Sequence, residues 1–544
     1  MNSLVLLLVG IVLLLVAYVF YGGYLAKEWG IDPSRKTPAH TLKDDVDYCP
    51  TNPNVLLGHH FSSIAGAGPI AGPIQAAIFG WLPVYLWVVI GSIFFGGVHD
   101  WGSLFASIRH DGKSIGEIIR VNLGQKGKML FNIFAWLALV LVVAAFTDIC
   151  ASTFAFNPET GDLTGARAGT ASILFIFLAM AFGYFVYRKG TKLGISTIIG
   201  VALLFFCIYL GYTFPVFKLS KLAWDVILIV YIFAASTMPV WFLLQPRDYL
   251  CSYLLYSMLA GGIIGVFIVR PEITLAAYNG FIVGEGPKAQ YLFPMLFVTV
   301  ACGAISGFHS LVGSGTTSKQ ISNEKDSKLI GYGGMLLEGL VAILALISVA
   351  AFKDAKGTPA AIFASGVASF MNSFGLPIPV GKVFVILAFS AFALTSLDTA
   401  TRIGRYVFQE FFDNADGTAS KSSISNMYVA TGVTVCASAL LLLYGYTKIW
   451  PIFGASNQLL AGLSLLSLTV WFAKTGKKYT MTLLPMIFMF AVTLSALVIL
   501  VRNFFAAGNI LLGVMAIVLF ILAVILIITA ANSMKGDKAK DLKA

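Results

Sequence analysis

The chain has 544 residues, of which 58% are hydrophobic and only 11% are charged, so it is too apolar to fold as a set of soluble domains. Its formal net charge of +11 does not indicate a nucleic-acid partner, because the Lys and Arg residues lie in short loops between apolar segments and not on one basic face. The six Cys residues are scattered singly, which predicts neither a disulfide framework nor a cysteine metal site. We therefore expect an all-α polytopic membrane protein in contact with the lipid bilayer.

Apolar segments of about twenty residues, the length that crosses a bilayer, occur fifteen times. They cover residues 4–24, 54–79, 83–106, 129–152, 169–187, 193–213, 223–245, 249–269, 290–315, 330–352, 379–400, 425–446, 450–473, 480–501 and 508–532. Residues 359–373 are too short to span and are predicted to be interfacial or re-entrant. If the N-terminus is outside, the inner connections hold 26 of the 36 Lys and Arg residues, as the positive-inside rule expects. The C-terminus is then cytoplasmic, and the first segment is a retained helix and not a signal peptide.

The second segment, residues 54–79, is predicted to be a broken helix. Its sequence GHHFSSIAGAGPIAGP contains three Gly and two Pro residues between Gly66 and Pro73. Each Pro removes a backbone donor and strains the preceding turn, so the helix should open near Gly66 to Pro69. In hydrocarbon an open turn survives only where it is buried in protein or borders a polar cavity. The opening therefore predicts a binding site, with a simple packing kink as the alternative.

A second interruption is expected in residues 223–245, where IFAASTMPVWFLL places small and polar residues beside Pro239. With the first segment set aside, this helix follows the broken helix by five spans and runs in the opposite direction. Interrupted helices in equivalent places of two inverted halves are typical of secondary transporters. Four regions are predicted. Residues 1–53 form an extra N-terminal helix with a cytoplasmic loop, and residues 54–410 form a ten-helix transport core whose halves are 54–222 and 223–410. Residues 411–533 form four additional helices, and residues 534–544 form a cytoplasmic tail.

Six long motifs in a fixed order cover nearly the whole chain. They are GHHFSSIAGAGPIAGP, MPVWFLLQPRDYL, ACGAISGFHSLVGSGTTSKQ, GYGGMLLEG, TSLDTATRIGRYVFQE and WPIFGASNQLLAG. On these motifs the chain resembles the carbon starvation protein A (CstA) family. The resemblance implies a bacterial inner-membrane carrier of the amino acid, polyamine and organocation superfamily, with a LeuT-type 5+5 inverted-repeat core and about five additional helices. It also implies uptake of peptides, or of pyruvate with protons, under carbon starvation, with no cofactor.

The nutrient is expected to bind between the two interruptions. The open amides of the second half-helix present a positive dipole end, which suits a carboxylate near Gly68, Ile70 and Ala71. The rest of the nutrient would contact the other interrupted segment. The predicted substrate-binding residues are Gly66, Ala67, Gly68, Pro69, Ile70, Ala71, Ser236, Thr237 and Trp241.

The coupling ion is predicted to be H+, with Na+ as the alternative. In a LeuT-type core, hydroxyls of the eighth core helix and carbonyls of the first break frame a cation site, and hard oxygen ligands suit sodium. The residues in those places here are Ala65, Gly66, Ser314, Thr316 and Thr317. The same hydroxyls could instead cap the helix end or bond back to its carbonyls.

Coupling to protons needs a titratable group inside or beside the core helices. The candidates are Lys192, His309, Glu338 and Asp398. The alternative for the two carboxylates is static pairing with basic neighbours, for which the sequence offers Arg402, Arg405 and Lys319.

A group of histidines lies close to the break. His59 and His60 precede it by less than two turns, and His99 and Asp100 lie near the inner end of the next helix. Successive helical residues point about a hundred degrees apart, so His59 and His60 cannot both face one small site. One of them, together with His99 and Asp100, could form a packed hydrogen-bond cluster, a cytoplasmic gate, a proton relay or an N/O metal site.

Two charged pairs are expected at the cytoplasmic face, Arg109 with Asp111 and Arg247 with Asp248. Such pairs commonly fix loops, and in a carrier they could also close the inner gate.

Together these features predict a secondary active importer of small nutrients that works by alternating access. A channel is disfavoured because the sparse charges do not ring a continuous pore. An enzyme is disfavoured because no nucleophile and base form a convincing pair, and the adjacent histidines lack the spacing of a zinc protease.

Overall fold

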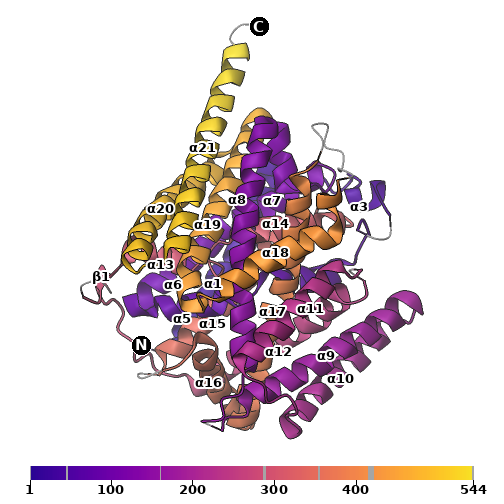
Figure 1. Ribbon diagram of the computed structural model, residues 1–544, viewed down its shortest axis with the longest axis vertical. Coiled ribbons are helices and arrows are strands. Elements are labelled where there is room, and N and C mark those ends of the chain that lie inside the picture. Colours follow the sequence, from indigo (N-terminus) through magenta and orange to yellow (C-terminus); the bar gives the residue numbers. More distant parts are fainter. Residues whose placement is uncertain are drawn as a thin grey trace.

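The computed structural model describes residues 2–44, 47–159, 161–239, 241–285, 289–352, 356–413 and 422–541, without the side chains of Tyr187, Tyr446 and 533–541. Several helices, among them α8 and α21, run roughly along the long axis, and α21 projects beyond the rest of the molecule at one end (Figure 1). Within the described ranges the sheet structure is a two-stranded antiparallel hairpin of β1 (Ile282–Val283) and β2 (Gln290–Tyr291). The predicted all-α polytopic architecture is confirmed.

Eleven helical segments of the described chain are long and apolar enough to cross a membrane. Their elements are α1 (Ser3–Val16) with α2 (Gly22–Trp29), α6 (Trp81–Ile90) with α7 (Gly97–Arg109), α8 (Ile115–Phe154), α9 (Thr164–Gly183), α10 (Leu193–Thr213), α12 (Leu244–Val269), α15 (Gly334–Ala350), α17 (Ile378–Glu410), α19 (Tyr446–Lys474), α20 (Thr480–Ala506) and α21 (Ile510–Asp541). Short π-helical turns join or flank several of them, at Ala17–Tyr21, Gly91–Gly96, Tyr184–Arg188 and Lys328–Gly333. Single 3-10 turns lie between other helices, at Ala77–Phe79, Thr317–Lys319, Asn372–Phe374 and Ser423–Ser425.

Four further segments are interrupted or shorter, and with the eleven they account for the fifteen predicted spans. They are α4 (Pro53–Ile64) with α5 (Gly68–Ala76), α11 (Lys221–Thr237), α13 (Leu292–Thr299) with α14 (Gly307–Gly315), and α18 (Met427–Leu442). Two short helices remain, α3 (Pro38–Thr41) and α16 (Pro359–Met371). The second of these is the segment predicted to be too short to span, and it packs against α12 and α17.

The first break lies where the sequence predicts it. Helix α4 ends at Ile64 and α5 begins at Gly68 with Pro69 in its first turn. At Ala65 the backbone leaves the helical region with a ψ of 60°. The link Ala65–Ala67 is buried, which agrees with the expectation that an open turn at this depth must be enclosed by protein.

The second interruption predicted in residues 223–245 is a corner and not a break within a span. Helix α11 ends at Thr237, and α12 starts a full-length span of its own at Leu244. A break within a span does occur, but at Val300–Ser306, inside the segment predicted to be one continuous helix over 290–315. This opening contains no Pro, so the residue pattern alone predicts an unbroken helix there.

The two breaks face each other. A Cβ added at Gly68 would meet the side chain of Cys302, and one added at Gly72 would lie 2.7 Å from the carbonyl oxygen of Thr299. Only a residue without a side chain allows this approach. The partner of the first break is therefore the α13–α14 link, and the boundary at 222 between two halves of the core stays a prediction.

The segment predicted as four additional helices contains α18, α19, α20 and α21. Of these, α19 is buried along its whole apolar length and packs against α8, α14 and α20. It is therefore part of the packing around the breaks. Helix α21 continues to Asp541, so most of the predicted tail is helical. Residues 542–544 lie outside the described ranges.

Candidate functional site

The start of α5 is packed by protein in this conformation. No side chain caps it, as expected for an anion site. However, Gly68 lies against Cys302, and the amide of Ala71 donates to the carbonyl of Ala67 at 2.8 Å. The Ala71 amide makes the first helical hydrogen bond here, so the contact of a carboxylate with Ala71 stays a prediction. Cys302 of the α13–α14 link occupies the space beside Gly68 that a ligand bound there would need.

Helix α17 supports the end of α4. The hydroxyl of Ser396 donates to the carbonyl of Ser63 at 3.0 Å, and a Cβ at Gly66 would meet Ser396 and Phe146. One of the carbonyls freed near the break is thus satisfied by a side chain of the protein. Sequence reasoning missed Ser396, although it lies in the motif TSLDTATRIGRYVFQE.

Two adjacent amide side chains of α19 stabilise the second break. The Asn457 side chain accepts from the N–H of Phe308 at 2.9 Å and donates to the hydroxyl of Ser306 at 3.0 Å. The Gln458 amide donates to the carbonyls of Phe297 and, at 3.4 Å, of Val300. These bonds replace part of what the opened helix lost. The sequence signal was present as two consecutive amides in the apolar segment WPIFGASNQLLAG.

A charged network joins α4, α11, α12 and α17 and is named here the arginine network: His59, Ser63, Tyr231, Arg247, Asp248 and Asp398. The guanidinium of Arg247 is ion-paired with Asp398 and lies 3.3 Å from Asp248. The hydroxyl of Tyr231 donates to Asp398 at 2.7 Å and accepts from Arg247 at 2.5 Å. Arg247, Asp248 and Asp398 are at most 1% exposed. Thus Arg247 and Asp248 form a buried contact and not the predicted surface pair, and the partner of Asp398 is Arg247.

His59 and His60 point to different partners, as predicted from helical geometry. The Nδ1 atom of His59 lies 3.2 Å from Asp248, while the Nδ1 atom of His60 is hydrogen-bonded to the hydroxyl of Thr317 at 2.9 Å. His59 therefore belongs to the arginine network. Ser63 also reaches Asp248, at 3.4 Å.

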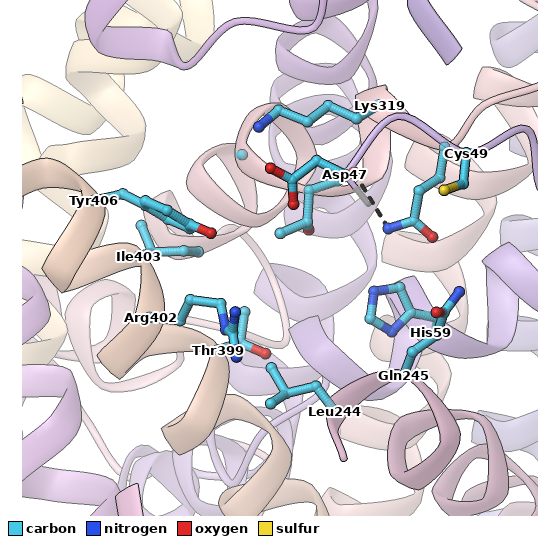
Figure 2. Close-up of a pocket in the computed structure, with 13 residues that line it drawn as sticks. Asp47, Cys49, His59, Leu244, Gln245, Lys319, Thr399, Arg402, Ile403 and Tyr406 are labelled. Atoms are coloured by element: carbon cyan, nitrogen blue, oxygen red, sulfur yellow. Dashed lines mark hydrogen bonds between the residues drawn. The ribbon is translucent and has the colours of Figure 1, made fainter. Parts of the chain in front are cut away.

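His59 also lines a narrow cavity of about 40 Å³. Figure 2 shows His59 and Gln245 on one side of it, and Thr399, Arg402 and Tyr406 of α17 on the other. The cavity has room for a few water molecules but not for a peptide. It connects the arginine network to the loop that precedes α4.

The arginines predicted as partners of buried carboxylates have another role. Arg402 donates to the carbonyls of Ala235 and Met238 at 2.9 and 2.5 Å, and Arg405 donates to the carbonyl of Ser236 at 2.6 Å. They satisfy the last carbonyls of α11, where helix ends leave acceptors without intrahelical partners. The third predicted partner, Lys319, lies over the ring of Tyr48.

The substrate residues predicted at the end of α11 and just after it lie at this same corner. The hydroxyl of Ser236 is buried without a hydrogen-bond partner among the described residues. The hydroxyl of Thr237 bonds back to carbonyls of its own helix, and Trp241 lies under the guanidinium of Arg188. The segment that faces Gly68 is the α13–α14 link instead.

A second polar cluster lies beyond the break and is named here the carboxylate–histidine cluster: His99, Asp100, Cys302, His309 and Glu338. Asp100 bonds to the Nδ1 atoms of His99 and His309, each at 2.7 Å. The Nε2 atom of His309 lies 3.3 Å from Glu338. None of the five side chains is more than 4% exposed. The described residues place no Lys or Arg within ion-pair distance of Asp100 or Glu338.

The predicted metal group of His59, His60, His99 and Asp100 is not assembled. His59 and His60 turn to Asp248 and Thr317, and only His99 and Asp100 meet. Among the described residues, the group whose ligand atoms lie within 4.8 Å of one another is Cys302, His309 and Glu338.

Lys192 is exposed at the start of α10 and lies in neither cluster, so its role as a coupling group stays a prediction. The hydroxyls of Ser314 and Thr316 donate to the carbonyls of Ser310 and Val312 at 2.7 and 2.9 Å. They follow the alternative of bonding back to the helix, and Thr317 is engaged by His60. The oxygen site predicted for sodium is not formed by these side chains.

Arg109 is paired with Glu324 at 2.6 Å and not with Asp111. Asp111 instead turns the chain with a φ of 57° and accepts from the Tyr48 hydroxyl through its carbonyl. Nearby, burial and the charge of Arg109 lower the pKa of Lys477, which donates to the carbonyl of Trp29. These contacts fasten loops to each other.

Comparison with solved structures finds similarity to transporters. A crystal structure of the manganese transporter of Eremococcus coleocola aligns with 91% of this chain and 99% of its own, at 13% identity and a TM-score of 0.45. MhsT in complex with L-phenylalanine aligns with 87% and 99%, at 13% identity and a TM-score of 0.47.

Sequence comparison finds much closer relatives. The peptide transporter CstA of Bacillus subtilis is 33% identical over 98% of this chain and 97% of its own length. The pyruvate/proton symporter BtsT of Escherichia coli is 33% identical over 84% of this chain and 75% of its own. The family model described as carbon starvation protein CstA matches residues 2–357 and 353–496. The chain therefore belongs to the carbon starvation protein CstA family.

Proposed function

We propose that this protein is a secondary active importer of small nutrients, peptides or pyruvate, driven by protons and working by alternating access. The names of its relatives support a transported peptide or pyruvate. The two facing breaks support a carrier, since such openings are found where transported ligands bind. On this proposal the protein has no enzymatic activity. It resides in a bacterial inner membrane with its N-terminus outside and its C-terminus in the cytoplasm, which the Lys and Arg asymmetry supports.

The single observation that carries proton coupling is the charge balance of the arginine network. Arg247 supplies one positive charge, while Asp248 and Asp398 supply two negative charges when both are ionised. A net charge that is buried in a membrane protein is costly, so one more proton is expected in the network. His59, Asp248 and Asp398 are the groups able to share it. Tyr231 faces Asp398 from α11 and fixes its orientation.

The cavity beside His59 gives this proton a route out. His59 contacts Asp248 on one side and lines the cavity on the other. On the proposed topology this cavity opens toward the cytoplasm when the carrier faces inward. Movement of the α13–α14 link away from Gly68 would then expose the start of α5 to the nutrient carboxylate, so that proton and substrate leave on the same side.

Reconstituted protein tests the proposal. Liposomes should accumulate labelled pyruvate or a dipeptide under an inward proton gradient, and they should show counterflow, which a channel does not give. The variant Asp398→Asn leaves one carboxylate for Arg247, so the network is neutral without an extra proton. This variant should lose gradient-driven accumulation but keep counterflow.

Lys192→Gln is the matched control, because it removes a titratable group that lies exposed outside both clusters. It should accumulate substrate as the wild type does. The sodium alternative predicts accumulation at equal pH under a sodium gradient, together with its loss in the double variant Ser314→Ala with Thr317→Ala. Either of these results, or normal accumulation by Asp398→Asn, would overturn proton coupling through the arginine network.

A further inference from the structure

The carboxylate–histidine cluster contains a set of soft and hard ligand atoms that the transport proposal does not use. The Sγ atom of Cys302, a ring nitrogen of His309 and a carboxylate oxygen of Glu338 lie within 4.8 Å of one another. They come from three elements, the α13–α14 link, α14 and α15. We propose that these three side chains bind a divalent transition-metal ion of the zinc type, between the second break and α15.

The distance between the His309 and Glu338 ligand atoms fits such an ion. Zinc is bound by histidine nitrogen and carboxylate oxygen at about 2.0 to 2.2 Å, which places two ligands of a tetrahedral site about 3.3 Å from each other. The Nε2 atom of His309 and the Oε2 atom of Glu338 are 3.3 Å apart. Three protein ligands leave the fourth position for water or another small ligand.

The atoms of His309 and Glu338 that face the site lack hydrogen bonds to the described residues. Both carboxylate oxygens of Glu338 and the Nε2 atom of His309 are buried without a hydrogen bond within the described part of the chain. Buried polar atoms are normally hydrogen-bonded, and each exception calls for a ligand or another explanation. A closed network of side chains would have satisfied the carboxylate of Glu338. It would also place a Lys or Arg beside the carboxylate, as Arg247 lies beside Asp398 in the arginine network, but the described residues place none at Glu338.

The second shell also has the arrangement of a metal site. A histidine that binds a metal usually donates its other ring N–H to a carboxylate, which fixes the ring and makes it a better ligand. The Nδ1 atom of His309 bonds to Asp100 at 2.7 Å, and Asp100 is held in turn by His99 at 2.7 Å. Asn457 lies 3.7 Å from the Cys302 sulfur and positions the link that carries it. Thus Asp100 and His99, for which a metal site was one of four alternatives from the sequence, become positioning residues.

The chemistry of the set selects the ion. Thiolate and imidazole are poor ligands for magnesium and calcium, which prefer oxygen. A mixed sulfur, nitrogen and oxygen set favours zinc, cobalt or iron in the divalent state. From the scattered Cys residues, the sequence analysis predicted no cysteine metal site. The proposed site could not be found in that way, because its ligands are distributed over thirty-seven residues and three elements.

A metal-binding experiment tests the proposal independently of transport. The full-length protein is purified in detergent with a tag that contains no histidine, and bound metal is removed with a chelator. Titration with Co2+ should give a thiolate-to-cobalt charge-transfer band, and elemental analysis after Zn2+ loading should give about one ion per chain. Zn2+ should also raise the melting temperature. Cys302→Ser should remove the band, and Asp100→Asn should weaken binding about 10- to 100-fold.

Cys150→Ser is the matched control, because Cys150 is also fully buried in a membrane helix but belongs to no ligand group. It should keep the band and the stoichiometry. If Cys302→Ser does not fold, Glu338→Gln provides the same test through the loss of Zn2+-dependent stabilisation. Absence of stoichiometric binding by the wild type, or equal binding by Cys302→Ser or Glu338→Gln, would overturn the site while leaving the transport proposal untouched.

Discussion

The arginine network and the carboxylate–histidine cluster both contain two buried carboxylates, but they differ in their cations. In the first, Arg247 contacts both Asp248 and Asp398. In the second, Asp100 and Glu338 have only histidine partners within the described residues. A permanent positive charge fixes the number of protons that a buried site needs, whereas histidine alone leaves room for a metal ion. The same residue types thus support a proton site in one place and a ligand set in the other.

The largest effect should come from removing that permanent charge. Arg247→Met leaves Asp248 and Asp398 buried without their cation, which should cost about 3–5 kcal/mol of stability. The measurement is the melting temperature and the yield of folded protein in detergent. The double variant Arg247→Met with Asp398→Leu removes the pair together and should recover much of the loss. A single variant as stable as the wild type would show that the network is not held by Arg247.

A smaller loss of stability is expected when the carboxylate–histidine cluster loses a supporting side chain of α19. Asn457→Ala removes the acceptor for the Phe308 N–H and the donor to Ser306. The loss of this cap should cost about 1–2 kcal/mol, seen as a lower melting temperature. Ser456→Ala is the control, because the Ser456 hydroxyl donates only to the Phe453 carbonyl of its own helix. Equal effects of the two changes would contradict the assigned role of Asn457.

The smallest effect should have the opposite sign. Without metal, Glu338→Gln replaces a buried carboxylate that has no hydrogen bond by a neutral group, so the melting temperature should rise slightly, by the equivalent of about 1 kcal/mol. Glu324→Gln should instead lower it, because the Glu324 carboxylate accepts from Arg109. A loss of stability in Glu338→Gln as large as that in Glu324→Gln would mean that the Glu338 carboxylate has a stabilising partner after all, and the contrast between the clusters would fail.

Much of the architecture could be predicted because it depends on local chemistry. The length of each apolar segment, set by bilayer thickness, led to the fifteen spans. The break at Ala65–Ala67 followed from glycine and proline, whose backbone restrictions act within a single turn. The different directions of His59 and His60 followed from the helical repeat.

The second break could not be predicted in the same way. The sequence of the link Val300–Ser306 has no Pro, and the groups that satisfy its backbone belong to Asn457 and Gln458, about 150 residues further along the chain. In a membrane an unpaired backbone group is expensive, so whether a helix opens depends on what a distant helix offers to it. The corner at Thr237 is likewise completed by Arg402 and Arg405 of α17.

By itself the sequence determined the membrane class, the helical segments, the first break and the family to which the chain belongs. Only the tertiary structure decided which buried charges meet: Asp398 with Arg247, and Glu338 with His309. The physical reason is one of range. Helix formation and helix breaking depend on neighbours within a few residues, whereas the cost of burying a charge is offset only by groups that packing brings within a few ångströms from anywhere in the chain.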